Sequence, residues 1–99
     1  MAQGDWRDQL NFSPVGAHTQ NSSLSSAVTL TIPDGASKIM LQVQTQNVRL
    51  TIDGTAPTTS KGFQLKAGNP ALLIPLGRAT ALKVIEEAAT AVLDYQFGD

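Results

Sequence analysis

The sequence predicts an all-β domain of about seven antiparallel strands, arranged as a two-sheet sandwich or a small barrel. From residue 27 onward, apolar and polar side chains alternate with a period of two in successive short runs. Residues typical of turns separate these runs at intervals of about 8 to 12 residues. Strands do not alternate with helical patterns, so a parallel sheet is not indicated. The 99 residues, of which 41% are hydrophobic, are enough for one modest core.

The expected strands follow this alternation along the chain. Three apolar side chains share one face of the first run, which ends at the Pro-Asp-Gly turn of residues 33–35. Prolines on both sides of the apolar run 71–74 indicate an edge strand or a strand that crosses between sheets. The pattern assigns strands to the following segments: 27–32, 38–44, 48–52, 62–66, 71–74, a part of 78–91, and 91–97.

Residues 78–91 carry two conflicting signals. This segment is rich in Ala, Leu, Lys and Glu, which all favour a helix. Against a helix stand the β-branched pair Val84-Ile85 and the short distance to the alternating run 91–97. The regular spacing of the upstream strands also favours strand, turn and strand, which is the prediction for this part of the chain.

Residues 1–25 are predicted to form an extended N-terminal arm, followed by the β-sandwich domain at 26–99. The second half of the arm is rich in Ser, Thr, Pro and Gly and has few large apolar side chains. Trp6, Leu10 and Phe12 are the exceptions, and exposing them to water is unfavourable. Two interpretations are open: the arm folds back and these side chains fill the edge of its own core, or they dock on a neighbouring protein.

A sharp turn is predicted after the run 48–52, because Asp53-Gly54 is a pair that tolerates positive φ. The loop that follows, residues 55–60, is uncharged and rich in Thr, and it contains Pro57. This loop is compatible with a contact surface and equally with a solvated turn.

No catalytic, cofactor-binding or metal-binding constellation is present, and an enzyme is not expected. His18 is the only histidine, and the chain has no cysteine, so His-based nucleophile systems and multi-His or thiolate metal sites lack their residues. The acids Glu86 and Glu87 are adjacent, and neighbouring strand residues point to opposite faces. No glycine-rich phosphate-binding motif occurs. No cofactor is therefore expected.

The charge distribution disfavours nucleic acids and membrane surfaces as partners. The net charge is -1, and acidic and basic residues are dispersed along the chain. No apolar stretch approaches the roughly 20 residues of a membrane-spanning helix, and the polar start does not have the order of a signal peptide. These features indicate a protein made and used in the cytosol, or inside an assembly formed there.

The aromatic side chains allow one alternative function. Trp6, Phe63, Tyr95 and Phe97 are the residue types that form sugar-stacking platforms in carbohydrate-binding modules. Most of these positions lie on expected strands or in the arm, where packing into a core is the commoner role. A carbohydrate-binding module requires that such faces are exposed to solvent.

The segment VRLTIDGTAPT at 48–58, followed by Gly62 and by LKAG at 65–68, resembles small virion proteins of tailed bacteriophages. The similar order of strands and turns extends over residues 27–97 and excludes the arm. Residues 86–89, Glu-Glu-Ala-Ala, stand where such proteins often have a glycine-containing turn. The resemblance implies a β-sandwich or jelly-roll-like structural protein of the phage particle.

What the resemblance implies for function is a non-enzymatic capsid decoration or cement protein. Such a protein is made in the host cytoplasm, lies on the capsid surface of the virion, binds the major capsid protein or another virion protein, and is a homo-oligomer, with a trimer expected. Alternatives are a tail or head-to-tail completion protein of the virion, or a carbohydrate-binding attachment module. The expected protein-contact residues come from the arm and from the turn after residue 52: Trp6, Leu10, Phe12, Asp53, Thr55 and Pro57.

Overall fold

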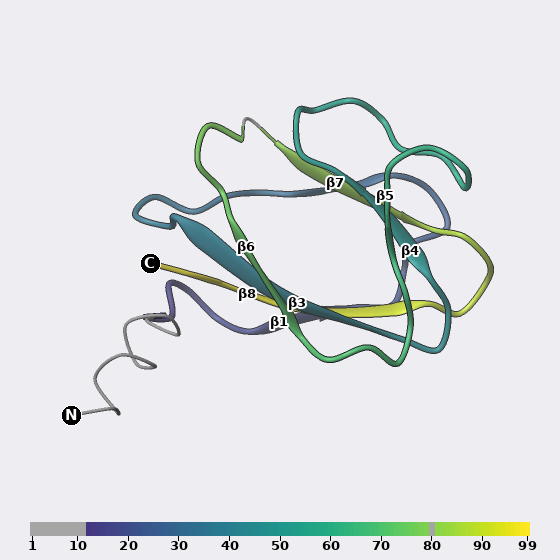
Figure 1. Ribbon diagram of the computed structural model, residues 1–99, viewed down its shortest axis with the longest axis horizontal. Helices are drawn as coiled ribbons and strands as arrows, with labels where there is room; N and C mark the ends of the chain where they lie inside the picture. Colours follow the sequence, from purple (N-terminus) through teal and green to yellow (C-terminus); the bar gives the residue numbers. More distant parts are fainter. Residues whose placement is uncertain (1–11, 80) are drawn as a thin grey trace.

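The computed structural model describes residues 12–79 and 81–99 of the chain, which form two four-stranded antiparallel sheets packed face to face (Figure 1). No helix occurs among the described residues, and thus none that could span a membrane. The strands are β1 (Thr19–Asn21), β2 (Val28–Leu30), β3 (Lys38–Gln44), β4 (Val48–Thr51), β5 (Phe63–Leu65), β6 (Leu72–Pro75), β7 (Leu82–Glu86) and β8 (Val92–Gly98).

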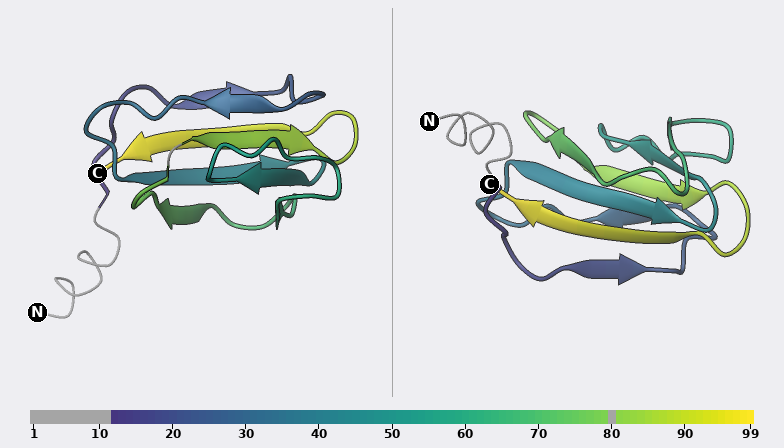
Figure 2. Two further views of the ribbon diagram at one scale, coloured as in Figure 1. Left: turned by 90° about the horizontal axis from the view of Figure 1, so that it is seen from above. Right: turned by 60° about the horizontal axis from the view of Figure 1, so that its bottom comes forward.

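Strands that follow each other along the chain mostly belong to different sheets. The first sheet has the order β1-β8-β3-β6, and the second sheet has the order β2-β7-β4-β5. Strands β1 and β2 lie at one edge of the sandwich, and β5 and β6 lie at the other (Figure 2). Every pairing within the sheets is antiparallel. The all-β sandwich predicted from the alternating pattern is thus confirmed.

The structure has eight strands where about seven were expected, because β1 lies in the segment predicted as an arm. β1 pairs with β8, with Thr19 opposite Tyr95 and Asn21 opposite Leu93. The nearby Leu24 is buried in the core with 1% of its surface exposed. The described part of the predicted arm, residues 12–25, therefore packs against the sandwich. Residues 1–11 lie outside the described part of the chain.

The ambiguous segment 78–91 forms β7 and the turn that leads into β8, as predicted. Leu82 and Val84 of β7 have 0% of their surface exposed, and β7 pairs with β2 and β4. Core packing and pairing on both sides outweigh the helical propensity of the alanine and glutamate residues. The helix alternative is wrong.

The core lies between the two sheets. Every second residue of a strand points inward and contributes to it. Tyr95 and Phe97 meet edge to face there, with ring centres 5.8 Å apart. Such packing excludes water from the apolar surface, which is the main source of stability in a chain without disulfides. The buried apolar residues are Leu24, Leu30, Ile39, Leu41, Val43, Val48, Leu50, Leu76, Leu82, Val84, Ala91, Leu93 and Phe97.

The N-terminal side of the described chain is fixed to its C-terminus. The backbone N–H groups of Ser13 and Asp99 each donate to the other residue's carbonyl, at 2.8 Å. The ring of Phe12 fills the space above Gly98, where an added Cβ would overlap ring atoms of Phe12. Phe12, one of the expected contact residues, thus packs half-buried against its own domain.

Candidate functional site

The large apolar side chains that are exposed among the described residues gather at the edge of the sandwich formed by β5 and β6. They are Ile52, Phe63 and Leu72, with 39%, 66% and 48% of their surface exposed. Phe63 begins β5, Leu72 begins β6, and Ile52 follows the end of β4 next to β5. We call these three residues the apolar edge. Large apolar side chains exposed along one edge are candidates for an interaction site.

Phe63 is exposed because its strand has no outer neighbour. The register of β4 and β5 places Phe63 opposite Leu50, which is 1% exposed and faces the core. Phe63 therefore points to the inner side of the sheet, as its place in the alternating pattern predicts. β5 pairs only with β4, so no further strand covers the ring.

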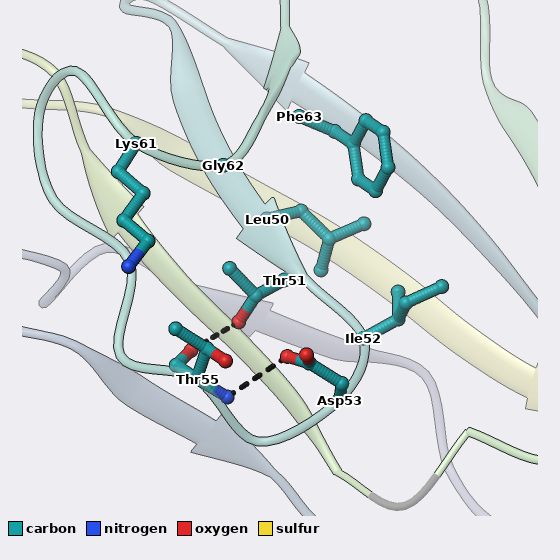
Figure 3. Close-up of a pocket in the computed structure, with 8 residues that line it drawn as sticks. All are labelled: Leu50, Thr51, Ile52, Asp53, Thr55, Lys61, Gly62 and Phe63. Atoms are coloured by element: carbon teal, nitrogen blue, oxygen red, sulfur yellow. Dashed lines mark hydrogen bonds between the residues drawn. The ribbon is translucent and has the colours of Figure 1, made fainter.

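A pocket of about 460 Å³ opens beside Phe63 (Figure 3). Its volume is within the range of small-ligand sites. The apolar side chains of Leu50, Ile52 and Phe63 lie on one side of it, and polar side chains lie on the other. The lining residues are Leu50, Thr51, Ile52, Asp53, Thr55, Lys61, Gly62 and Phe63.

Asp53 and Thr55 shape the turn at the rim of this pocket. The backbone N–H of Thr55 donates to Oδ1 of Asp53 at 3.0 Å, and the hydroxyl of Thr51 donates to the carbonyl of Thr55. The hydrogen bond from the Thr55 backbone lowers the pKa of the Asp53 carboxyl below its usual value. Gly54 has a φ of +87°, so the predicted sharp turn is present. Asp53 is exposed at this turn.

The loop after this turn is folded onto itself. Thr58 and Lys61 exchange backbone hydrogen bonds of 3.1 and 3.2 Å, which close a small hairpin. Pro57, one of the expected contact residues, is buried. Asp53 and Lys61, in contrast, are exposed.

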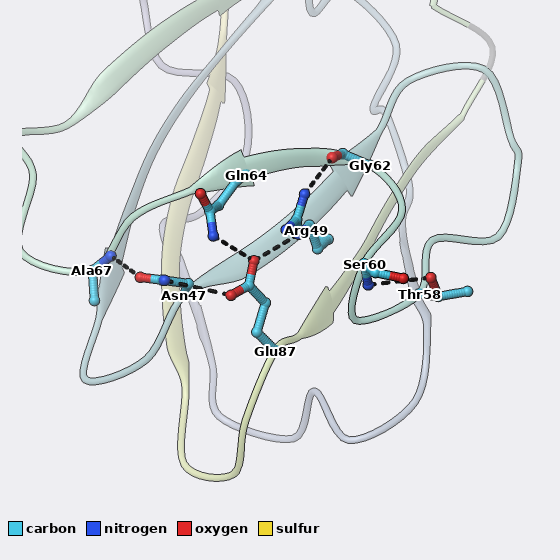
Figure 4. Close-up of polar contacts among 8 residues, drawn as sticks. All are labelled: Asn47, Arg49, Thr58, Ser60, Gly62, Gln64, Ala67 and Glu87. Atoms are coloured by element: carbon cyan, nitrogen blue, oxygen red, sulfur yellow. Dashed lines mark hydrogen bonds and ion pairs between the residues drawn. The ribbon is translucent and has the colours of Figure 1, made fainter.

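A polar network holds β5 in place on the other face of the second sheet (Figure 4). Gln64 of β5 donates to Oε2 of Glu87 at 2.8 Å, and Asn47 donates to Oε1 at 3.4 Å. Arg49 Nη1 donates to the carbonyl of Gly62 at 3.1 Å, and its Nε lies 2.6 Å from Glu87 Oε2 as an ion pair. The hydrogen bond from Gln64 is the largest cause that lowers the pKa of the Glu87 carboxyl. Asn47 and Arg49 lower this pKa further. Arg49 thereby anchors the backbone next to Phe63.

A second polar cluster lies on the outer face of the first sheet. His18 Nε2 lies 3.0 Å from Oδ1 of Asp94 and must donate to it, because a carboxylate only accepts. Gln20 and Gln44 donate to Oδ2, at 3.4 and 2.6 Å. The bond from His18 is the largest cause that lowers the pKa of Asp94. The amide groups of Gln20 and Gln44 cannot act as nucleophiles. No group of three or more potential metal ligands occurs in residues 12–79 and 81–99.

The structure brings together only part of the expected contact set. Asp53 and Thr55 lie at the rim of the pocket, Pro57 is buried, and Phe12 packs on Gly98. Trp6 and Leu10 lie outside the described residues. Phe63, Ile52 and Lys61 also line the pocket but were not among the expected protein-contact residues; Phe63 was considered only as a sugar-stacking aromatic. The sequence does contain a signal for Phe63: it stands in a short strand between Lys61 and Lys66, and lysines of this kind are typical of an edge strand.

The aromatic residues do not form a joint platform in the described part of the chain. Phe97 is buried, and Tyr95 and Phe12 are half-buried, so among the aromatic residues that the structure describes only Phe63 is exposed. Comparison with known proteins finds no matching family model, and no curated protein or solved structure that is significantly similar.

Proposed function

We propose that the protein is a non-enzymatic structural component of a bacteriophage particle, a decoration or cement protein that binds the major capsid protein and stabilises the shell. The observation that carries this proposal is the apolar edge, Ile52, Phe63 and Leu72. Such an edge suits binding to another protein surface.

We further propose that the fold is a jelly roll. Four antiparallel pairs, β1 with β8, β2 with β7, β3 with β6 and β4 with β5, are nested along the chain and distributed over two sheets. This nesting supports the proposal, because jelly rolls have eight strands in two sheets and occur in viral capsid and lectin domains.

The size of the apolar edge suits a protein that is present in many copies. Full burial of one large apolar side chain is worth only about 1.5 to 3 kcal/mol, so one edge of this kind gives a modest affinity. Repetition over a symmetric shell, and an oligomer such as a trimer, multiply that affinity. The location implied is the capsid surface, after synthesis in the host cytoplasm.

The proposal is tested by co-sedimentation of the full chain with empty capsids of tailed phages. Phe63→Ala is expected to weaken capsid binding roughly tenfold or more, because it removes the most exposed apolar anchor. Gln42→Ala is the matched control, since Gln42 is also an exposed strand residue but lies in β3 of the first sheet. Failure of the unaltered chain to bind any capsid, or equal binding by both variants, would contradict the proposal.

A carbohydrate-binding attachment module is the second candidate, and the exposed ring of Phe63 beside Asp53, Thr55 and Lys61 favours it. Sugars stack on aromatic rings while their hydroxyls bond to such polar groups. Binding to a glycan array that Phe63→Ala abolishes, without capsid binding, would select this candidate. A ring at the portal in electron micrographs would instead indicate a tail or head-to-tail completion protein.

A further inference from the structure

The outer edge of β6 combines unpaired backbone groups, exposed apolar surface and an absence of charge. The outermost strands of the two sheets are β1, β2, β5 and β6 (Figure 2). β1 is polar, Leu30 of β2 is buried, and β5 has a lysine near each end, at positions 61 and 66. Residues 69–77, which contain β6, include no charged side chain, and Leu72 is 48% exposed. An uncharged edge of this kind is a template for pairing with another strand.

The backbone groups of β6 point alternately toward β3 and toward the free side. The N–H of Leu76 donates to the carbonyl of Ser37 at 2.8 Å, in continuation of the register between β3 and β6. Hydrogen-bonded and non-hydrogen-bonded pairs alternate in an antiparallel ladder, so residues 72 and 74 also direct their backbone groups to β3. The N–H and C=O of Leu73 therefore point away from β3 and are available to a second strand.

The proline at the end of β6 does not prevent such pairing. Pro75 is also at an outward position, where it lacks an N–H but keeps its carbonyl as an acceptor. In a twofold pairing centred on Leu73, this residue exchanges both hydrogen bonds with Leu73 of the second copy. The N–H of Ala71 then donates to the carbonyl of Pro75. This register uses no donor that proline lacks.

The same register brings apolar side chains together on the inner face of the sheet. Leu72 and Ile74 lie on this face, because they stand opposite the buried Leu41 and Ile39 of β3. With Leu73 at the centre, Leu72 of each copy lies beside Ile74 of the other copy. A pocket of about 350 Å³ between β5 and β6 has Leu72 and Leu41 in its lining. The space next to Leu72 is thus open to a side chain from a second copy.

We propose that two copies of this chain associate through β6, in antiparallel order and centred on Leu73. The first sheets of the two copies then form one continuous sheet. Twofold symmetry occupies both β6 edges, so the assembly closes as a dimer, and a trimer would require a different surface. The interface is short, so the dissociation constant is expected to be roughly 10 μM to 1 mM. This inference does not rest on the capsid role, because both partners are this chain.

Exchange of charge at Leu73 tests the twofold register. Leu73 is half-buried on the outer face of the sheet, opposite Met40, so a charged side chain there can reach water. Leu73→Lys and Leu73→Glu each place like charges opposite each other in the dimer. Each variant alone is expected to associate roughly tenfold more weakly in sedimentation velocity. An equimolar mixture is expected to form a mixed dimer, because opposite charges then face each other.

A matched control and a melt separate this effect from general effects of charge. Gln42→Lys adds the same charge to the outer face of the same sheet, but in the interior strand β3. This variant is expected to associate as the unaltered chain does. Thermal melts in dilute solution, where the chain is monomeric, show whether each Leu73 variant keeps the fold.

Amide hydrogen exchange, measured by NMR, gives an independent readout. The amide of Leu73 is expected to exchange more slowly at high protein concentration than at low concentration, because its N–H is bonded only in the dimer. The amides of Leu72 and Ile74 are bonded to β3 in each copy. Their exchange is therefore expected to depend little on concentration.

Three outcomes would overturn the proposal. One is an unaltered chain that stays monomeric up to about 1 mM, which would leave this edge to an extended segment of a different protein. Another is association that both Leu73 variants retain at full strength, which would place the contact elsewhere. The third is a mixture of the two variants that forms no mixed dimer. None of these measurements uses a capsid, so their failure is distinct from a failure of capsid binding.

Discussion

Replacing Gly62 with alanine tests the local geometry that places Phe63 at the edge of the sandwich. Gly62 has a φ of +124°, and a Cβ there would lie 3.1 Å from the carbonyl oxygen and 3.3 Å from the nitrogen of Leu50. These are backbone atoms of β4 and cannot swing aside as a side-chain end can. The substitution therefore adds backbone strain and pushes β5 away from β4.

The magnitude follows from a comparison with Gly68, which has a φ of +85° but no atom within 4 Å of an added Cβ. Gly68→Ala carries strain alone, about 1 to 2 kcal/mol for a left-handed residue, partly offset by the lower entropy of the unfolded chain. Gly62→Ala adopts a conformation that is nearly restricted to glycine, for about 1 to 3 kcal/mol, and also disturbs β4. We expect losses of unfolding free energy of about 3 kcal/mol for Gly62→Ala and about 1 kcal/mol for Gly68→Ala.

Thermal unfolding followed by circular dichroism measures this difference. A gap of about 2 kcal/mol corresponds to a Tm for Gly62→Ala that is roughly 8 to 16 °C below that of Gly68→Ala in a domain of this size. Urea unfolding gives the free energies independently. Melting of the two variants within about 2 °C of each other would refute the reasoning, because the close approach to Leu50 would then carry no penalty.

Three further predictions concern the core, the chain ends and pH. Leu93→Ala is expected to lower the unfolding free energy by about 2 to 5 kcal/mol in urea titrations, because this side chain is fully buried. Gly98→Ala is expected to displace the ring of Phe12 and lower the Tm, but to have little effect in a Phe12→Ala background; equal losses in both backgrounds would contradict this contact. Asp94 has a lowered pKa in the fold, so its contribution to stability is complete above the usual value of 3.8 and is lost as the pH falls through the lower folded pKa. The Tm difference between the unaltered chain and Asp94→Asn is therefore expected to shrink below pH 3.8, and a constant difference would exclude this linkage.

The alternating pattern predicted seven strands because their inward side chains are buried between two sheets. The eighth strand, β1, carried no such signal, since Thr19, Gln20 and Asn21 are all polar and lie on an outer edge. Leu24 stands alone between serines, so its burial could not be inferred from a period. Edge strands that bury little apolar surface are the elements that patterns of this kind miss.

The site was predictable only in part, for a related reason. A period of two shows which face of a strand a residue occupies, but it contains no information on strand order. Phe63 therefore had the pattern of a core residue and became an exposed one when β5 took the edge position. The turn residues Asp53 and Thr55 were expected from their local chemistry, and the structure places them at the pocket rim. The burial of Pro57 depends on how the loop folds back, which local sequence does not encode.

The two lysines at the ends of β5 also limit how this edge can be used. If β5 of two copies paired antiparallel, Lys61 of one copy would lie close to Lys66 of the other. The two positive charges would repel each other in the new sheet. The edge thus opposes pairing with an identical edge while leaving Phe63 open to a different surface. An exposed aromatic ring on a strand with a lysine near each end is the arrangement expected of an edge that selects its partner.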